Sequence, residues 1–305
     1  MASPGHIRDS VKQIDETSWL IGGKHIVRYF QRPYKCECLL KNSRDGSCYT
    51  LSDATPTLPA AEPIPSDSYV HQIHDAGDSS AVFSFGETLI LKVKSTSEGG
   101  LQEHDTLVSL AQKQLSFNIP TVLFCFQEAK RTYLFEPYMT GKSLNEVWWD
   151  MDTDGKEHLS TRIASICSEL AAFPPSDIMI SVDYNWMDPL REPEQRDCSP
   201  AALKTHCTNL GMDCSNYVFS HNDLGPTNIL IHGDQITIID WDLAGYYPLA
   251  WVRTKFAICG ALDMERVSNN VEWKLGDMGF PEVTGAYNEL WKTRLEEWKK
   301  RRLWL

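Results

Sequence analysis

Three short segments between residues 69 and 94 carry apolar side chains in the alternating order of a pleated strand. These segments are residues 69–74, 81–85 and 88–94, and turns at Gly77 and Gly86 separate them. An alternation with a period of two residues, bounded by turns, is typical of β-strands. The pattern predicts three consecutive antiparallel strands.

The hydrophobic period changes after residue 100. Apolar residues then recur at offsets compatible with one helix face: Leu101, Val108, Ala111 and Leu115. Pro120 would end such a helix, because proline cannot continue the backbone hydrogen bonds. Residues 121–126 and 132–135 favour two more strands.

Beyond Gly141 the pattern is mostly helical, except for apolar runs at 228–231 and 236–240 that predict a hairpin. A strand-rich lobe, a short hinge and a helix-rich lobe with one hairpin is the element order of a kinase. We therefore predict an α+β, protein-kinase-like two-lobed fold, with an antiparallel sheet and one helix in the N-lobe and a mainly helical C-lobe. The predicted boundaries are residues 1–65 for an N-terminal extension and proline-rich linker, 66–140 for the N-lobe, and 141–305 for the C-lobe with the catalytic loop.

The two ends of the chain carry weaker patterns. Residues 19–21 and 25–30 fit either short strands or one helix, and residues 36–50 fit a hairpin. The four prolines between residues 55 and 66 suit a stiff linker, since proline fits neither a helix interior nor a central strand. Residues 291–305 predict an amphipathic helix.

Composition limits the class of protein. Of the 305 residues, 42% are hydrophobic and 23% are charged, which is ordinary for a globular chain. The net charge of -12 argues against a nucleic-acid binder, which needs a basic surface, and suits a cationic small-molecule ligand. We find no signal segment and no apolar run long enough to cross a bilayer. Nine scattered cysteines suit reduced thiols, so we expect a cytoplasmic protein.

The residues with the clearest chemistry lie between His221 and Asp240. Phosphoryl transfer needs an acceptor for the hydroxyl proton and oxygen ligands for Mg²⁺. Asp223 is the candidate base, while Asn228 and Asp240 supply oxygens that a hard cation accepts. A hairpin between Asn228 and Asp240 returns the chain beside its start, so both side chains can face one metal site. We expect His221 to brace the loop. The competing interpretation is an ordinary turn with capping aspartates.

Side chains in the N-lobe are candidates for holding nucleotide phosphates. Lys92 and Lys94 alternate onto one strand face, so the period does not choose between them; we prefer Lys92, which apolar residues flank on both sides. Glu103 in the following helix is the expected partner of the lysine. A solvated lysine and a surface glutamate are the alternative. Ser79 and Ser80 lie in the turn best suited to covering phosphates, although it lacks a three-glycine pattern.

Two further sets of residues are candidates for binding. An adenine ring needs backbone donors at the hinge, where Pro137 has no N–H, so we expect Tyr138 or Met139 to donate. A simple interlobe linker is the alternative. Asp242 and Trp241 are candidates on the substrate side. Three other tryptophans could wall an apolar or cationic ligand, although core packing is the favoured role for most of them: Trp148, Trp149 and Trp186.

The block Phe219-Ser-His-Asn-Asp-Leu-Gly-Pro-Thr-Asn-Ile-Leu-Ile is followed by Ile238-Ile-Asp-Trp-Asp-Leu-Ala-Gly-Tyr-Tyr-Pro. Together they resemble the aminoglycoside/choline kinase-like phosphotransferases, particularly the fungal members, whose motif continues as Trp251-Val-Arg-Thr-Lys-Phe does here. The resemblance runs from about Tyr69 to the C-terminus. It implies ATP-dependent transfer to a small-molecule hydroxyl, with Asp223 as base, Asn228 and Asp240 on magnesium, Lys92 on the phosphates and Glu103 as its partner.

We therefore expect an ATP- and Mg²⁺-dependent phosphotransferase that acts on a hydroxyl of a small-molecule metabolite, in a setting of fungal secondary metabolism. Two alternatives remain open: a kinase fold repurposed for a step such as cyclisation or dehydration, and a non-catalytic binding module. Intact Asp223, Asn228 and Asp240 weigh against the second alternative. The same acids could serve as general acid and base in the first.

Overall fold

The computed structural model describes residues 5–31, 38–42, 46–55, 57–96, 102–174, 200–258 and 265–302. The chain divides by its internal contacts into two compact units. Unit 1 comprises residues 1–98 and 120–140, and unit 2 comprises residues 99–119 and 141–305.

The first sheet of unit 1 has six strands in the order β4-β5-β3-β2-β1-β6. Its strands are β1 (Val11–Asp15), β2 (Ser18–Ile21), β3 (His25–Phe30), β4 (Leu40–Lys41), β5 (Cys48–Asp53) and β6 (Glu62–Pro63). A short 3-10 helix, η1 (Ile7–Ser10), precedes them. The N-terminal segments therefore form strands, not the helix that the hydrophobic pattern had left open.

The predicted proline-rich linker contributes a strand to this sheet. Strand β6 pairs with β1, with Pro63 opposite Lys12. It lies at the edge of the sheet, where a strand tolerates proline because the missing N–H needs no partner there. The predicted hairpin in residues 36–50 is present as β4 and β5, with Leu40 opposite Tyr49. Its residues 36, 37 and 43–45 lie outside the described part of the chain.

The second sheet of unit 1 has five strands in the order β10-β11-β9-β8-β7. Its strands are β7 (Val70–Asp75), β8 (Ser80–Phe85), β9 (Leu89–Ser95), β10 (Phe124–Glu128) and β11 (Arg131–Pro137). All neighbouring pairs in this sheet are antiparallel. The five strands that the pattern predicted are confirmed, within a few residues at each end.

The two sheets of unit 1 share one hydrophobic core. Trp19 of the first sheet packs edge-to-face against Phe85 of the second, with ring centroids 5.4 Å apart. Both side chains are fully buried, and so is Ile7 of η1. The N-terminal extension is therefore part of the core of unit 1, since its apolar residues cover the apolar face of the second sheet.

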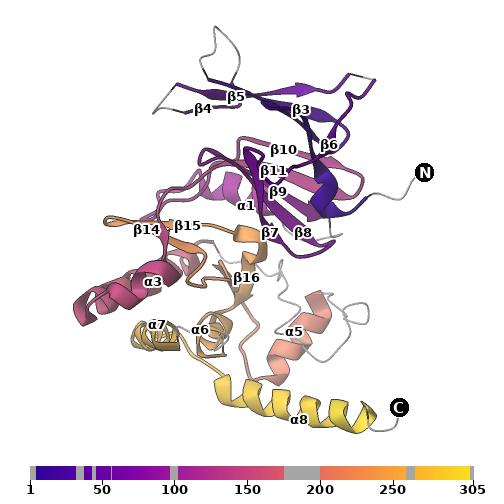
Figure 1. Cartoon of the computed structure of the whole chain (residues 1–305). Coiled ribbons are helices and arrows are strands. Elements are labelled where there is room, and N and C mark those ends of the chain that lie inside the picture. Colours follow the sequence, from indigo (N-terminus) through magenta and orange to yellow (C-terminus); the bar gives the residue numbers. More distant parts are fainter. Residues whose placement is uncertain are drawn as a thin grey trace. The chain divides into compact units, whose positions relative to one another are not determined.

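Unit 2 is mainly helical (Figure 1). Its helices are α1 (Glu103–Leu110), α2 (Leu144–Val147), α3 (Thr153–Ala171), α5 (Pro200–Asn209), α6 (Leu249–Ile258), α7 (Glu265–Asp277) and α8 (Thr284–Arg302), with 3-10 turns η2 (Trp148–Asp150) and η4 (Trp241–Leu243). Strands β12 (Lys142–Ser143), β14 (Ile229–His232) and β15 (Gln235–Ile238) form one small sheet, and β13 (Tyr217–Ser220) pairs with β16 (Gly245–Pro248). The β14–β15 hairpin confirms the prediction. The β13–β16 pair corrects the view that this hairpin is the one exception to helix.

Helix α1 is shorter than the pattern suggests and buries a different face. Val108, assigned to the apolar face, is 48% exposed. The buried residues are Glu103, Thr106, Leu107 and Leu110. The predicted helix is present but its predicted face is wrong, because a buried glutamate with a backbone partner occupies a position that an apolar pattern cannot reveal.

The C-terminal helix α8 starts at Thr284, seven residues before the predicted start at Trp291. None of the helices in the described ranges is both long and apolar enough to span a membrane.

Replacing Trp19 with alanine should lower the free energy of unfolding by about 3–5 kcal/mol, because it deletes a fully buried aromatic side chain from the shared core of unit 1. Urea denaturation followed by circular dichroism measures the change. Ile73→Ala is the matched control, since the Ile73 side chain on β7 is 56% exposed and should change stability by at most about 0.5 kcal/mol. Equal stability of the two variants would contradict the shared core.

Candidate active site

The loop from His221 to Asn228 connects β13 to β14 in unit 2. Two backbone hydrogen bonds shape it: Gly225 N–H donates to Asp223 O over 2.7 Å, and Asn228 N–H donates to Gly225 O over 3.0 Å. Strand β13 pairs with β16 and β14 pairs with β15. The 221–228 loop is therefore held at both ends by sheet hydrogen bonds.

The His221 ring is fully buried and joins the loop to the segment before Asp240. Its Nδ1 accepts a hydrogen bond from Asp223 N–H at 3.2 Å, so this nitrogen carries no proton. The protonated nitrogen is then Nε2, which donates to Ile239 O at 3.1 Å. The ring also packs edge-on against Trp241, with centroids 4.5 Å apart. This is the geometry of a bracing side chain.

Burial lowers the pKa of His221 below its usual value, because desolvation penalises the charged imidazolium. The carboxylates of Asp240 and Asp223 act in the opposite direction as smaller causes. The folded protein therefore holds a neutral ring, which is the state that its two hydrogen bonds require.

The Asn228 side chain orients Asp223. Its Nδ2 donates to Asp223 O over 2.9 Å and to Asp223 Oδ2 over 3.1 Å. Both bonds use the amide nitrogen of Asn228, and the amide oxygen Oδ1 points in a different direction. Oδ1 is therefore the atom that could bind a cation.

The hairpin brings Asn228 beside the segment that carries Asp240. Ile229 lies opposite Ile238 in the β14–β15 ladder, and Ile239 N–H donates to Asn228 O over 3.0 Å. Asp240 follows directly in the left-handed conformation, with φ 62°. Aspartate tolerates this conformation better than most residues do.

Asn228 and Asp240 offer an amide and a carboxylate oxygen, the donor types that Mg²⁺ prefers. The described residues contain no group of three or more His, Cys, Asp and Glu side chains placed to hold a metal. A magnesium ion held by these two oxygens would complete its coordination with water and nucleotide oxygens. The residues present fit the ion that the sequence predicts.

Glu103 contacts the segment that follows Asp240. Its Oε1 accepts a hydrogen bond from Trp241 N–H over 3.0 Å, and the residue is 6% exposed. This bond ties α1 to η4 within unit 2. The expected partner of Glu103 is Lys92, which belongs to unit 1, so that pairing stays a prediction.

Asn222 is a residue of the loop that the sequence interpretation missed. It is buried, with a left-handed φ of 63°. Its Nδ2 donates to Tyr247 Oη over 3.0 Å, and its Oδ1 accepts from Trp251 Nε1 over 2.9 Å. Asn222 therefore ties the loop to β16 and α6. An asparagine between His221 and Asp223 is itself the available signal, because asparagine is enriched at left-handed positions.

In unit 1 the preferred phosphate-binding lysine makes a buried ion pair. Lys92 Nζ lies 3.3 Å from Glu136 Oε2, and the two side chains are 10% and 3% exposed. Lys92 on β9 lies opposite Leu134 on β11, so Glu136 is its diagonal neighbour on the same face. Lys94, two residues on, is only half-buried.

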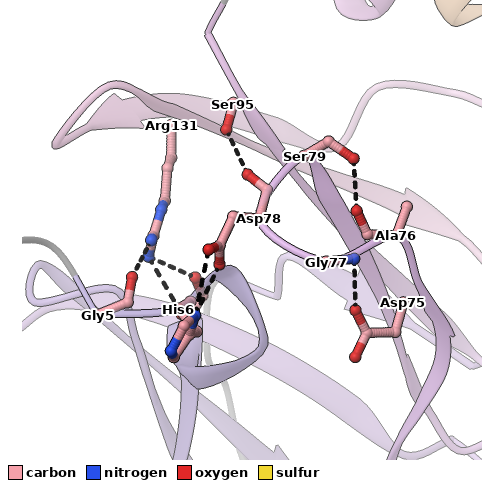
Figure 2. A network of polar contacts seen from close by, with 10 residues as sticks. Gly5, His6, Asp75, Ala76, Gly77, Asp78, Ser79, Ser95 and Arg131 are labelled. Atoms are coloured by element: carbon pink, nitrogen blue, oxygen red, sulfur yellow. Dashed lines mark hydrogen bonds and ion pairs between the residues drawn. The ribbon is translucent and has the colours of Figure 1, made fainter. Parts of the chain in front are cut away.

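The turn between β7 and β8, residues 76–79, is closed by its own polar groups (Figure 2). Gly77 N–H donates to the Asp75 carboxylate over 2.8 Å, and Ser79 Oγ donates to Ala76 O over 2.7 Å. The Ser79 hydroxyl thus has a partner inside the turn. Ser80 is half-buried at the start of β8.

The two expected hinge donors differ in the structure. Tyr138 N–H donates to Thr88 O over 2.8 Å. For Met139 N–H, no backbone acceptor is seen within the described ranges. Met139 is therefore the better candidate of the two for an adenine donor.

Trp241 is a fully buried core side chain. Its ring stacks on Phe117 with centroids 6.1 Å apart, and its Nε1 donates to Ile238 O over 3.0 Å. Asp242, the other substrate-side candidate, is exposed. The remaining tryptophans differ: Trp148 is buried, Trp149 is 57% exposed, and Trp186 lies outside the described residues.

The profile of the phosphotransferase enzyme family, APH, matches residues 71–251. The chain belongs to this APH family. The matched stretch begins in β7 and ends in α6, so it contains Lys92, the 221–228 loop and Asp240. A search of curated protein sequences returned no match.

Solved structures of APH proteins share the fold. The streptomycin–ATP–APH(2″)-IIa ternary complex matches with a TM-score of 0.50 at 17% identity, covering 68% of this chain and 76% of that chain. A thermostable mutant of aminoglycoside phosphotransferase APH(4)-Ia in its apo form matches with a TM-score of 0.50 at 18% identity, covering 77% and 90%. A ternary complex of APH(4)-Ia with AMP-PNP and hygromycin B gives 0.50 at 16% identity, covering 78% and 90%. The predicted α+β, kinase-like fold is confirmed.

Asn222→Ala should lower the free energy of unfolding by about 2–4 kcal/mol, because it strands the buried Trp251 N–H and puts alanine at a left-handed position. Asn222→Gly loses the same bonds but accepts the backbone conformation, so it should be more stable than the alanine variant by about 1 kcal/mol. Urea denaturation of both variants measures this. Wild-type stability in both would contradict the anchoring role.

The lowered pKa of His221 predicts a loss of stability in acid. Below about pH 6.5 the unfolded chain protonates this histidine, whereas the folded protein does so only at lower pH. The unfolded state then binds more protons than the folded state. The free energy of unfolding therefore decreases as the pH is lowered, by at most about 1.4 kcal/mol per pH unit for one site.

Unfolding curves between pH 5 and 7 compare the wild type with His221→Gln, which should have a shallower slope. Burial also lowers the pKa of His25 in unit 1, so His25→Gln is a parallel measurement with its own separate contribution. An unchanged slope in His221→Gln would contradict the neutral buried ring.

Proposed function

We propose that this APH family member is an ATP- and Mg²⁺-dependent phosphotransferase that transfers the γ-phosphoryl group to a hydroxyl of a small-molecule metabolite. The observation that carries the proposal is the single hydrogen-bonded unit formed by Asp223, Asn228 and the β14–β15 hairpin that leads to Asp240. It supplies a carboxylate and two oxygen ligands, which are the parts that phosphoryl transfer needs.

In this proposal Asp223 accepts the proton of the acceptor hydroxyl. Its carboxylate is oriented by Asn228 Nδ2, and its backbone N–H is held by His221. Asn228 Oδ1 and the Asp240 carboxylate would hold Mg²⁺. When bound, MgATP would supply the phosphoryl group, and its magnesium ion would offset the negative charge of the phosphates. The protein then acts mainly by positioning, which is the largest part of catalysis in this reaction class.

On the nucleotide side, burial and the ion pair with Glu136 support Lys92, not Lys94, as the phosphate ligand. Glu103 is proposed to join this lysine when both lobes hold nucleotide. Met139 N–H is proposed as the adenine donor, because the Tyr138 N–H is already bonded to Thr88 O.

The acceptor is proposed at the level of chemical class. Related structures contain streptomycin or hygromycin B together with a nucleotide. This chain carries a net charge of -12, which favours cationic ligands over anionic ones. Amine-bearing alcohols are therefore the first class to test, and aromatic alcohols the second, as acceptors from secondary metabolism.

Calorimetric titration with ATP in the presence and absence of Mg²⁺ tests the nucleotide part of the proposal. Asp240→Ala should raise the Kd for MgATP at least about tenfold, because it removes a metal ligand. Asp223→Asn should keep nucleotide binding but lower turnover by about 10²–10⁴-fold on any acceptor that the wild type phosphorylates. The acceptor panel consists of amino alcohols, aminoglycosides and aromatic alcohols.

Asp234→Asn is the matched control, since Asp234 is an exposed aspartate in the turn of the same hairpin. It should match the wild type in both measurements. If the wild type binds no nucleotide at millimolar ATP, the phosphotransferase proposal fails and a repurposed kinase fold is favoured. If it binds neither nucleotide nor any candidate acceptor, a binding module for another ligand is favoured.

A further inference from the structure

The N-terminal extension binds the turn between β7 and β8, which the sequence predicts to cover the nucleotide phosphates. His6 Nδ1 lies 2.9 Å from Asp78 Oδ1 and 3.2 Å from Asp78 Oδ2 (Figure 2). A carboxylate only accepts hydrogen bonds, so the imidazole donates. The bond from His6 is the largest cause that lowers the pKa of Asp78, and the backbone N–H of Ile7 acts in the same direction.

The segment that presents His6 is itself anchored in unit 1. The guanidinium of Arg131 donates to Gly5 O and to Ser10 Oγ, the latter over 3.2 Å (Figure 2 shows the bond to Gly5). Ile7, next in sequence to His6, is fully buried in the core. The His6 side chain is 61% exposed, but the backbone that carries it is therefore held in place.

The other side of the turn is held by β9. Ser95 Oγ donates to Asp78 O over 2.8 Å, and Ser95 N–H donates to Ser79 O over 2.9 Å. A turn with one glycine is thus restrained from two directions, by the N-terminal extension and by the strand that carries Lys92.

The negative charge of Asp78 is the reason that its contact with His6 matters for nucleotide binding. Asp78 is an exposed carboxylate at the turn, and nucleotide phosphates are also negative, so a bare Asp78 would repel them. Two groups of the N-terminal segment lie close enough to counter this charge: His6, and at longer range Arg8.

We propose that His6 is a positioning residue for nucleotide binding: it holds Asp78 and shields its charge, so that the turn accepts the phosphates of ATP. This inference rests on the proposed function. It gives the N-terminal extension a part in the site that the family match, which starts at residue 71, does not include.

A double-mutant cycle on the full-length chain tests the inference, with the Kd for MgATP measured by calorimetry so that no acceptor is required. His6→Ala should raise the Kd about threefold to fivefold, the scale of one exposed polar contact to a carboxylate. Asp78→Asn, which has no charge to shield, should change the Kd less. Adding His6→Ala to Asp78→Asn should have no further effect, because the shielded charge is gone.

His74→Ala is the matched control, since His74 is an exposed histidine on β7 of the same hairpin, and it should bind MgATP like the wild type. Melting temperatures of all variants should stay within about 2 °C of the wild type, as expected for exposed substitutions. Weaker binding that comes only with a lower melting temperature would assign His6 a structural role and overturn the proposal.

The remaining outcomes separate the two proposals. A wild type that binds no MgATP overturns the proposed function and this inference with it. A wild type that binds MgATP, with His6→Ala unchanged or with additive effects of the two substitutions, overturns this inference alone.

Discussion

The neutral ring of His221 accepts a hydrogen bond from the backbone N–H of Asp223 and donates a hydrogen bond to the carbonyl oxygen of Ile239. The first bond holds the candidate base, and the second holds the residue before the candidate metal ligand Asp240. Only one protonation state satisfies both bonds, and burial selects that state. The placement of Asp223 relative to Asp240 therefore depends on the uncharged side chain of His221.

Two further contacts fix the same region from other directions. Glu103 binds the backbone of Trp241, and Asn222 binds Tyr247 and Trp251. Both contacts use buried polar side chains, so displacement of a partner would leave a buried donor or acceptor without that hydrogen bond. Trp251, which follows the candidate catalytic segment in sequence, thereby acquires a physical role: it donates a hydrogen bond to Asn222 of the loop.

Local patterns in the sequence were sufficient to predict the strands β7 to β11 and the β14–β15 hairpin. They were also sufficient to propose His221, Asp223, Asn228 and Asp240 as site residues. These depend on short-range alternation, turns and fixed spacing. Three features required contacts distant in sequence. The β13–β16 pair consists of two short strands separated by the whole 221–228 loop and hairpin. The buried face of α1 includes a glutamate whose partner lies far along the chain, at Trp241. The six-stranded sheet needs the second sheet to cover its apolar residues.

The site residues divide in the same way. A motif reveals the type and order of chemical groups, and here it indicated a candidate base and two candidate metal ligands. A motif does not reveal which donors already make hydrogen bonds within the protein. The sequence therefore offered Tyr138 and Met139 as equal adenine donors, although Tyr138 N–H bonds to Thr88 O. It also offered Ser79 as a phosphate ligand, although the Ser79 hydroxyl donates to Ala76 O. Asn222 escaped notice because its role is conformational as well as polar.

The APH match starts inside β7, but the core of unit 1 starts earlier, at Ile7 and Trp19. A fragment cut at the boundary of the match would uncover Phe85 and the apolar face around it, and an exposed apolar patch of this kind promotes aggregation. The stretch that defines kinship with other phosphotransferases is thus smaller than the stretch that folds. The stretch that the family shares begins at residue 71, whereas the side chains that build the core of unit 1 begin at Ile7.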